Sequence, residues 1–333
     1  MCTRCSGHRA KGNNGWPAHQ CWTSQNSDSP FAVLREDHQA MIAAGANKLF
    51  PDGQGSSGFI TEKAVQWAAV MLLSRAFSLD LQEEEGQAWD MGSDPDIALV
   101  PWADMLNHSS GAGKGSCLVY NPNSRIASLH AHRSYNQGEE VYDSYGPGLS
   151  PSKLLLDYGF VDSENHNHAV DLPASTLGPV KSKANEAFLE AIGLPIGGAI
   201  FTVTSSGVDE SVMAWTRAAV ASKEEMEEAG WREGHHNAPS IMIQFSQPTS
   251  QQNELEMLHR LLWACEGLLS KYPTTLAQDE AAIAVKGPSL PPARRQVLRA
   301  LMSEKLALQG ACHSFSDTIK KLHSGIPCGS LYP

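Results

Sequence analysis

The sequence lacks any apolar run close to the roughly 20 residues that a helix needs to cross a bilayer. It also lacks a short apolar segment of the signal-peptide kind near Met1. We therefore expect no membrane-spanning helix, no secretion and no membrane partner.

Basic residues are in deficit. The chain has 25 Lys and Arg against 36 Asp and Glu, a formal net charge of -11, and the acids are spread out rather than gathered in one run. A general nucleic-acid binder presents a basic face, so we expect no nucleic-acid partner. The charge fits a partner that presents lysine, although net charge alone identifies no partner.

Cysteine is too sparse for a disulfide scaffold, because the chain has 7 among 333 residues and the number is odd. We interpret most of them as reduced thiols of an intracellular protein. Cys2, Cys5 and His8 are soft ligands, but their spacing matches no zinc module, so we expect no metal site.

The first 30 residues have almost no aliphatic side chains and no acid before Asp28. A segment of this kind buries too little apolar surface to offset its ordering entropy, so 1–30 is predicted to be a disordered or atypical leader. Its mild positive bias leaves organelle targeting open. Chloroplast, cytoplasm and nucleus all remain compatible with the sequence.

Regular structure is predicted to begin near Phe31. A helix is expected from an N-cap at Thr61 to about Phe77, burying one face that includes Leu72. Residues 97–100 predict a short buried strand that ends before Pro101. Two further strands, 117–120 and 126–133, are expected to pair across a turn.

Ser150-Pro151 is typical of a helix start, with Ser as cap and Pro at the first helical position, and Gly159 is typical of the end of that helix. Beyond about Pro173 the pattern becomes mostly helical. One helix face is predicted from Leu255, Leu258, Leu262, Cys265 and Leu269, and another from Leu298, Leu301, Met302 and Leu306.

Two segments carry the strongest functional signal. Asp104-Met105-Leu106-Asn107-His108-Ser109 is followed by Gly138-Glu139-Glu140-Val141-Tyr142-Asp143-Ser144-Tyr145-Gly146, and then by Leu154-Leu155-Leu156-Asp157-Tyr158-Gly159-Phe160. Together they resemble the paired signature of SET-domain methyltransferases. Ser144-Tyr145-Gly146, and Tyr272-Pro273-Thr274-Thr275 further on, look like the Rubisco large-subunit methyltransferase branch of that family.

The resemblance implies an α+β fold class: a SET-type, β-rich pseudoknot core followed by a mostly α-helical domain. The implied division is a leader over 1–30, a SET domain over 31–175 (a helical insertion plus the C-terminal SET core) and a helical substrate-binding-like domain over 176–325. Members of the family begin with a Gly-rich β segment. Nothing like it precedes Phe31, so we expect the core to lack its N-terminal part.

By the same resemblance, S-adenosyl-L-methionine is the cofactor, and Asn107, His108 and Arg75 contact it. Tyr145 and Tyr158 are the expected catalytic residues and form walls of a lysine channel. Arg75, Asp104, Tyr120, Tyr145 and Tyr158 are the expected substrate-binding residues. The implied reaction is methyl transfer to a lysine side chain of a protein substrate.

Such chemistry requires a lysine amine that has lost its proton. At pH 7 this loss costs about 4–5 kcal/mol, because the ordinary pKa of lysine is about 10.4. A narrow aromatic channel lowers the cost, since desolvation disfavours the ammonium form. Tyrosine rings suit the walls of the channel, and their hydroxyls suit orientation of the amine.

Two other functions remain open. One is protein-histidine methylation, which a sister branch performs on actin; that branch lacks a tyrosine matching Tyr158, so the tyrosine here favours lysine. The other is a catalytically inactive SET-fold binding protein, which the absent Gly-rich segment motivates. The sequence does not identify the substrate protein, the degree of methylation or the oligomeric state.

Overall fold

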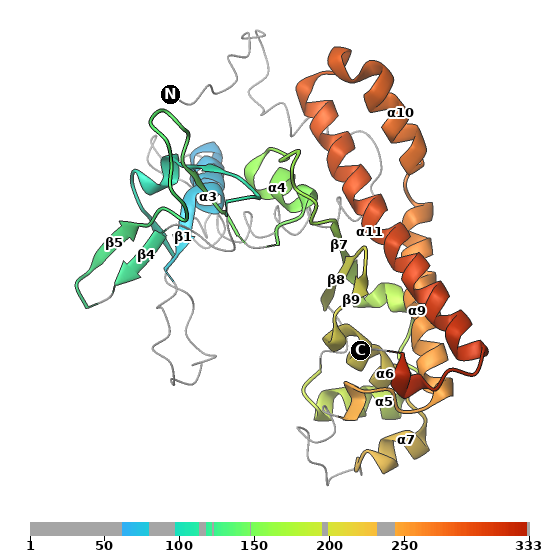
Figure 1. The fold of residues 1–333 in the computed structure, drawn as a ribbon. Coiled ribbons are helices and arrows are strands. Elements are labelled where there is room, and N and C mark those ends of the chain that lie inside the picture. Colours follow the sequence, from blue (N-terminus) through green and yellow to red (C-terminus); the bar gives the residue numbers. More distant parts are fainter. Residues whose placement is uncertain are drawn as a thin grey trace.

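In a computed structural model, the structure describes residues 62–79, 97–112, 118–121, 123–146, 148–194, 199–231 and 244–331. Predictions that fall on other residues, including the leader and the cap at Thr61, lie outside this part. Within it, no helix is both long enough and apolar enough to span a membrane. Figure 1 shows short strands and helices α3 and α4 in the first half, and a layered helical second half around a small sheet.

The first half contains short elements. They are α3 (Glu62–Arg75), β1 (Ala76–Ser78), β2 (Ile97–Leu99), a 3₁₀ turn (Ala103–Met105), β3 (Asn107–His108), β4 (Leu118–Asn121), β5 (Ile126–Leu129), β6 (Tyr142–Asp143) and α4 (Pro151–Tyr158). They form three two-stranded sheets, β1–β2, β3–β6 and β4–β5.

The second half contains the sheet and the longer helices. Its elements are β7 (Ala169–Pro173), a 3₁₀ turn (Ala174–Leu177), α5 (Lys183–Ala191), β8 (Ile200–Thr204), β9 (Gly207–Val208), α6 (Glu210–Val220), α7 (Lys223–Glu228), α9 (Gln251–Ser270), α10 (Leu276–Lys286), a 3₁₀ turn (Gly287–Ser289), α11 (Pro292–His323) and a last 3₁₀ turn (Cys328–Ser330).

Helix α3 ends earlier than predicted. Ala76 and Phe77 belong to β1, which pairs antiparallel with Leu99 and Ala98 of β2. The predicted burial of Leu72 is wrong, since the residue is 47% exposed. The strand at 97–99 is confirmed, but its burial is wrong, because Ile97 and Leu99 are both exposed.

The predicted hairpin and helix start are confirmed, but the second strand ends at Leu129, earlier than the predicted 126–133. Strands β4 and β5 pair antiparallel, with Tyr120 opposite Ala127. The Ser150 hydroxyl accepts a hydrogen bond from the Lys153 amide at the start of α4. Gly159 ends this helix in the left-handed conformation at φ 81°. An N-cap hydrogen bond such as that of Ser150 is worth about 1 kcal/mol.

The main hydrophobic core lies in the second half. Strands β7, β8 and β9 form an antiparallel sheet that the helical prediction missed. Helix α11 packs against this sheet, and α9 packs along α11 (Figure 1). The predicted face of α9 is confirmed at Leu258 and Cys265, which are buried. The predicted face of α11 is shifted, because Glu304, Lys305 and their neighbours are buried instead.

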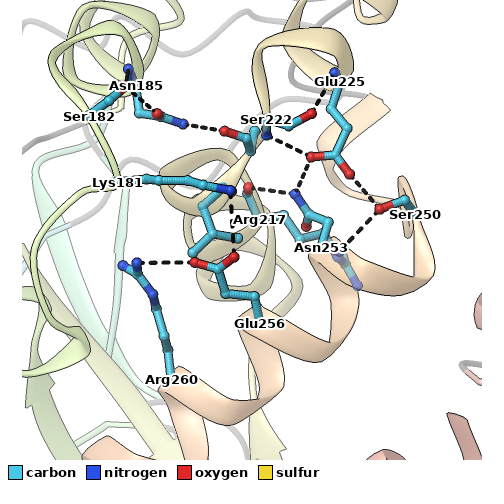
Figure 2. Close-up of polar contacts among 12 residues, drawn as sticks. Lys181, Ser182, Asn185, Arg217, Ser222, Glu225, Ser250, Asn253, Glu256 and Arg260 are labelled. Carbon is cyan, nitrogen blue, oxygen red and sulfur yellow. Dashed lines mark hydrogen bonds and ion pairs between the residues drawn. The ribbon is translucent and has the colours of Figure 1, made fainter. Parts of the chain in front are cut away.

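Buried polar groups join helices in this half. Arg217 on α6 forms a bidentate ion pair with Glu254 on α9, at 2.8 and 2.9 Å. Figure 2 shows Glu225 accepting hydrogen bonds from Ser222, Ser250 and Asn253. Because Ser222 and Ser250 cap α7 and α9, one carboxylate holds two helix starts together. Removing one member of a buried ion pair costs about 3–5 kcal/mol.

Helix α4 connects the two halves. Its Leu155 packs on Ala300 of α11, and the Ser152 hydroxyl lies 3.4 Å from the Ala300 carbonyl oxygen as a donor. Close by, His168 Nδ1 is 2.9 Å from the Ser303 hydroxyl. The motif segments of the first half are therefore fixed to the longest helix of the second.

Candidate functional site

The two motif segments lie side by side. Strand β3 pairs parallel with β6, with Asn107 opposite Tyr142 and His108 opposite Asp143. The Ser109 amide then donates to the Asp143 carbonyl oxygen at 3.1 Å. Segments more than thirty residues apart in the chain are thus joined into one short ladder.

Tyr145 ties the end of the second segment back to the first. Its amide donates to His108 Nδ1 at 3.1 Å, and its hydroxyl donates to the Leu106 carbonyl oxygen at 2.8 Å. The side chain therefore spans the Asn-His bend, and its phenol oxygen is held at a fixed position. A hydroxyl oxygen that donates in this way keeps its lone pairs available to a further donor.

Three rings gather around Tyr145. The ring centroids of Tyr145 and Tyr158 are 4.7 Å apart, and that of His108 lies 5.2 Å from Tyr145. Phe160 completes the group at 6.2 Å from Tyr145. The Tyr158 hydroxyl also donates to the Tyr145 carbonyl oxygen at 3.5 Å. This aromatic cluster, defined as His108, Tyr145, Tyr158 and Phe160, comes from the three motif segments of the sequence.

The aromatic cluster is neutral at physiological pH. Burial lowers the pKa of His108 from its ordinary value, against the opposing effect of Asp162 and Asp143. Because Nδ1 accepts from the Tyr145 amide, the proton of the neutral ring is on Nε2, which donates to the Ser110 hydroxyl at 3.1 Å. Burial and the nearby Asp157 raise the pKa of Tyr158, so its phenol stays protonated.

Asp162 supports the loop after β3. Its carboxylate accepts from the Ser110 amide at 2.8 Å and from the Glu164 amide at 3.0 Å. Burial alone would raise the pKa of Asp162, but these hydrogen bonds outweigh it and lower the pKa. Asp162 was not among the predicted site residues. Its position two residues after Phe160, at the end of the third motif segment, is the signal that could have identified it.

Glu140 is a second residue that the sequence analysis missed as an individual. Its carboxylate accepts from Asn107 Nδ2 at 2.6 Å and from the Tyr142 hydroxyl at 3.0 Å. It therefore bridges the register pair Asn107 and Tyr142 of β3 and β6. The adjacent acids Glu139 and Glu140 in the second motif are the sequence signal that could have identified it.

Arg75 and Asp104 lie together at the start of the first motif. The Arg75 guanidinium donates to the Asp104 carbonyl oxygen at 2.8 Å and forms a 3.4 Å ion pair with its carboxylate. The turn that holds Asp104 begins after Trp102, an exposed residue at φ 73°. Arg75, at the end of α3, thus restrains the turn that leads into β3.

Tyr120 is separate from this group. It lies on β4 of the hairpin that projects from the first half in Figure 1. No ring contact in the described part of the chain joins it to the aromatic cluster. The structure thus brings together Arg75 with Asp104, and His108 with Tyr145 and Tyr158, but not Tyr120 with either group.

A cavity of about 270 Å³ lies beside the aromatic cluster. It is lined by His108, Ser110, Ser144, Gly146, Gly148, Leu149, Glu164, Asn165, His166 and Asn167. Its wall combines imidazole, hydroxyl, amide and carboxylate groups. Such a wall suits a small polar ligand.

Comparison with known proteins finds similar folds and similar sequences. A family model described as Rubisco LSMT substrate-binding matches residues 182–308, so this part of the chain is similar to such a domain. The solved SET domain of LSMT bound to lysine and AdoHcy has the same fold, at a TM-score of 0.65 and 21% identity, covering 88% of this chain and 65% of that one.

Three curated relatives are similar in sequence. The chloroplastic Rubisco large-subunit N-methyltransferase of Pisum sativum is 32% identical over 133 residues, 38% of this chain and 23% of that protein. The chloroplastic fructose-bisphosphate aldolase-lysine N-methyltransferase of Arabidopsis thaliana is 28% identical, covering 81% of this chain and 54% of its own length. The actin-histidine N-methyltransferase of Mus musculus is 22% identical, with 76% of this chain and 41% of its own length covered.

The chain therefore spans only part of the length of the relatives that it matches. The resemblance to the Rubisco LSMT branch is confirmed in fold and in domain content, and the α+β fold class is confirmed with it. The exact division at residues 30, 175 and 325 stays a prediction.

Proposed function

We propose that this chain, which combines the fold of the LSMT SET domain with a Rubisco LSMT substrate-binding domain, is an S-adenosyl-L-methionine-dependent protein-lysine N-methyltransferase. The observation that carries the proposal is the convergence of Tyr145 and Tyr158 on the Asn-His bend, with the Tyr145 hydroxyl bonded to the Leu106 carbonyl oxygen.

The residues present suit this cofactor. One solved relative of the same fold holds AdoMet. The cavity beside the aromatic cluster offers Asn165 and Asn167 amides, the Ser144 hydroxyl and the His108 ring, which fit a ligand with amino-acid, ribose and base portions. Asn107 and His108 would hold it from β3. When bound, S-adenosyl-L-methionine supplies an electrophilic methyl group on sulfur.

The tyrosines would receive the lysine amine. Tyr158 stays protonated because burial and Asp157 raise its pKa, so it acts as a neutral wall and hydrogen-bonding group rather than as a base. Tyr145 presents its phenol oxygen at a position fixed by Leu106. Two neutral rings 4.7 Å apart disfavour an ammonium by desolvation and hold the amine in line for transfer.

Arg75 and Asp104 would act at the entrance. A carboxylate attracts the lysine ammonium before it is desolvated. Arg75 holds the turn through the Asp104 carbonyl oxygen and so positions both that carboxylate and the cofactor-contacting strand. Tyr120, on the separate hairpin, stays a predicted substrate contact without a neighbour in the aromatic cluster among the described residues.

The substrate is proposed to be a protein. The relatives are named for methylation of Rubisco, aldolase and actin, all of which are proteins. The helical domain would grip the substrate and present its lysine to the aromatic cluster. Two of these relatives are chloroplastic, which makes the chloroplast the first compartment in which to look for the protein.

Histidine methylation is the competing function, because relatives that methylate actin histidine also match most of the chain. Incubating the protein with S-adenosyl-L-methionine and Rubisco large subunit, plastid aldolase or actin, then mapping the methylated residue by mass spectrometry, separates the two. Methyl-lysine supports the proposal, and methyl-histidine alone contradicts it.

Tyr145→Phe tests the catalytic assignment. We expect kcat to fall by about 100-fold, the order found when one positioned polar contact to a reacting centre is removed. The free energy of unfolding should change by only about 1 kcal/mol, the worth of one hydrogen bond. Steady-state methyl transfer and denaturant unfolding measure the two quantities.

Tyr142→Phe is the matched control, because it removes a tyrosine hydroxyl on β6 that donates to Glu140 and lies outside the aromatic cluster. Its kcat should stay within a few-fold of the original. A Tyr145→Phe variant with an unchanged rate refutes the role of Tyr145. Calorimetric titration that finds no binding of S-adenosyl-L-methionine would instead favour the inactive binding protein.

A further inference from the structure

Two cysteines face each other between the long helices of the second half. Cys265 lies on α9 and Cys312 on α11, and both are free thiols. Cys265 is fully buried, whereas Cys312 is only partly buried at the edge of the same core. The two thiols are close enough for each to shift the pKa of the other.

The register of the helix pair supports this contact independently. At one end, Gln251 Nε2 donates to the Leu322 carbonyl oxygen at 3.2 Å. At the other, the Tyr272 hydroxyl donates to the Glu304 carboxylate at 2.6 Å. Helices α9 and α11 therefore run antiparallel. Cys265 precedes Tyr272, and Cys312 follows Glu304, by about two helical turns each, so the two cysteines lie opposite one another.

We propose that Cys265 and Cys312 form a reversible disulfide that links α9 to α11 within the substrate-binding domain. This assignment does not depend on the proposed methyl transfer, because it rests on the two thiols and the helix register alone. The remaining free cysteine of the described residues, Cys328, does not lie on either helix of this pair, because it belongs to the 3₁₀ turn after α11.

The two thiols differ in a way that orders the reaction. The neighbouring Cys265 thiol lowers the pKa of Cys312, and the Cys312 thiol, with burial, raises the pKa of Cys265. Cys312 is also the more exposed of the two. It is therefore the sulfur that meets an oxidant first, and Cys265 is the sulfur that completes the link.

The oxidant required is a small-molecule disulfide. The Cys312 thiolate attacks one of its sulfurs, which forms a mixed disulfide and releases one thiolate. The Cys265 sulfur then attacks the Cys312 sulfur and expels the second thiolate. The two protons of the cysteines pass to the two released thiolates, which become thiols. The protein loses two protons and two electrons, and the small disulfide takes them up to become two thiols.

The link would restrain α11 halfway along its length. The same helix packs on Leu155 of α4 through Ala300, and its contacts with α9 include the Tyr272–Glu304 hydrogen bond. A disulfide removes conformational freedom mainly from the unfolded chain. Oxidation would therefore stabilise the helical domain and the position of α11 against the first half, and reductant would reverse it.

The test uses the full chain and oxidised glutathione. Under non-reducing conditions, trypsin should yield one linked species that joins residues 261–271 to residues 306–320, lighter by two hydrogens than the two peptides together. Dithiothreitol should release both peptides. The Tm of the oxidised protein should lie roughly 5–10 °C above that of the reduced protein.

Three variants separate this pair from other thiols. Cys312→Ser and Cys265→Ala should each abolish the linked species and the Tm shift, whereas Cys328→Ser should keep both. A stable glutathione adduct on Cys312 with Cys265 unmodified overturns the proposal, as does a link from Cys312 to Cys328. If Cys265→Ala does not fold, the peptide map of the unaltered chain still decides.

Discussion

His108 is the residue whose protonation state holds the site together. Its neutral ring accepts the Tyr145 amide on Nδ1 and donates from Nε2 to Ser110. An imidazolium has no acceptor, so protonation would break the bond to Tyr145. Because burial lowers the pKa of His108, the intact arrangement is maintained at neutral pH.

We therefore expect an acid transition at this site. The unfolded chain protonates His108 near pH 6.5, and the folded chain does so at lower pH. The stability that the neutral ring contributes is present above pH 6.5 and is lost as pH falls through the folded-state pKa. In an NMR titration, the Tyr145 amide resonance should shift with the same midpoint as the His108 ring, below pH 6.5.

The Leu154 amide is the internal reference for this titration, because it donates to the Ser150 carbonyl oxygen within α4 and not to His108. It should not follow the His108 midpoint. If the ring titrates while the Tyr145 amide resonance stays fixed, the role given to Nδ1 is wrong.

At the residue scale, the sequence predicted best what neighbouring residues determine. Ser150, Pro151 and Gly159 specify both ends of α4 through capping, and all three behave as expected. Nothing local marks Asn107 and Tyr142 as partners, since strands of two residues have no periodicity to detect. Their pairing was foreseen only through the family resemblance. The roles of the site residues stay predictions.

At the scale of elements, the errors have one cause: tertiary contacts override local pattern. Ala76 and Phe77 continue the helical pattern of α3, yet they pair with β2 as a strand. On α11, Leu301 and Met302 were expected to be buried, but the buried positions include Glu304 and Lys305. These polar side chains are tolerated in the core because Tyr272 donates a hydrogen bond to Glu304 and Asp279 forms an ion pair with Lys305, contacts that hydrophobic periodicity cannot detect.

Helix α11 also depends on a glycine that packs against backbone. A Cβ at Gly310 would lie 2.4 Å from the Ser205 carbonyl oxygen, in the turn between β8 and β9. Gly310→Ala should therefore destabilise the protein by about 2 kcal/mol, the usual cost of overpacking, despite the better helix propensity of alanine. Urea unfolding measures the change.

Gly267 on α9 provides the contrast, because a Cβ there meets no atom within 4 Å. Gly267→Ala should be neutral or stabilising by up to about 1 kcal/mol. Equal effects of the two substitutions would mean that the turn between β8 and β9 moves freely away from α11.

At the scale of the whole molecule, Glu304 lies where the two halves meet. Its carboxylate accepts a hydrogen bond from the Tyr272 hydroxyl. Its other polar neighbours are Ser152 of α4, Asp171 of β7 and Lys305 on α11. Burial raises its pKa to about 7, from an ordinary value of 4.5, against the opposing hydrogen bond from Tyr272. The junction therefore favours a protonated carboxyl group.

The pH dependence of stability follows from this pKa. Between pH 4.5 and about 7 the folded chain keeps a proton on Glu304 that the unfolded chain has lost, so stability falls as pH rises. The loss amounts to about 3 kcal/mol and is complete above pH 7. In Glu304→Gln, the free energy of unfolding should decline correspondingly less between pH 5 and pH 8.

Glu228→Gln is the surface counterpart, since Glu228 is exposed at the end of α7. It should retain the slope of the unaltered protein. Identical slopes for all three proteins would show that Glu304 ionises without cost at the junction.

The ladder of β3 and β6 has a consequence for the order of folding. Each strand is two residues long, and the partners are separated by more than thirty residues of chain. Closing that loop costs conformational entropy, and the few contacts of the ladder offset only a small part of this cost. Helices α9 and α11, by contrast, share an extended buried face. We therefore expect the chain to assemble its helical half first and its tyrosine-lined bend last, so that mild denaturant opens the bend while most of the molecule stays folded.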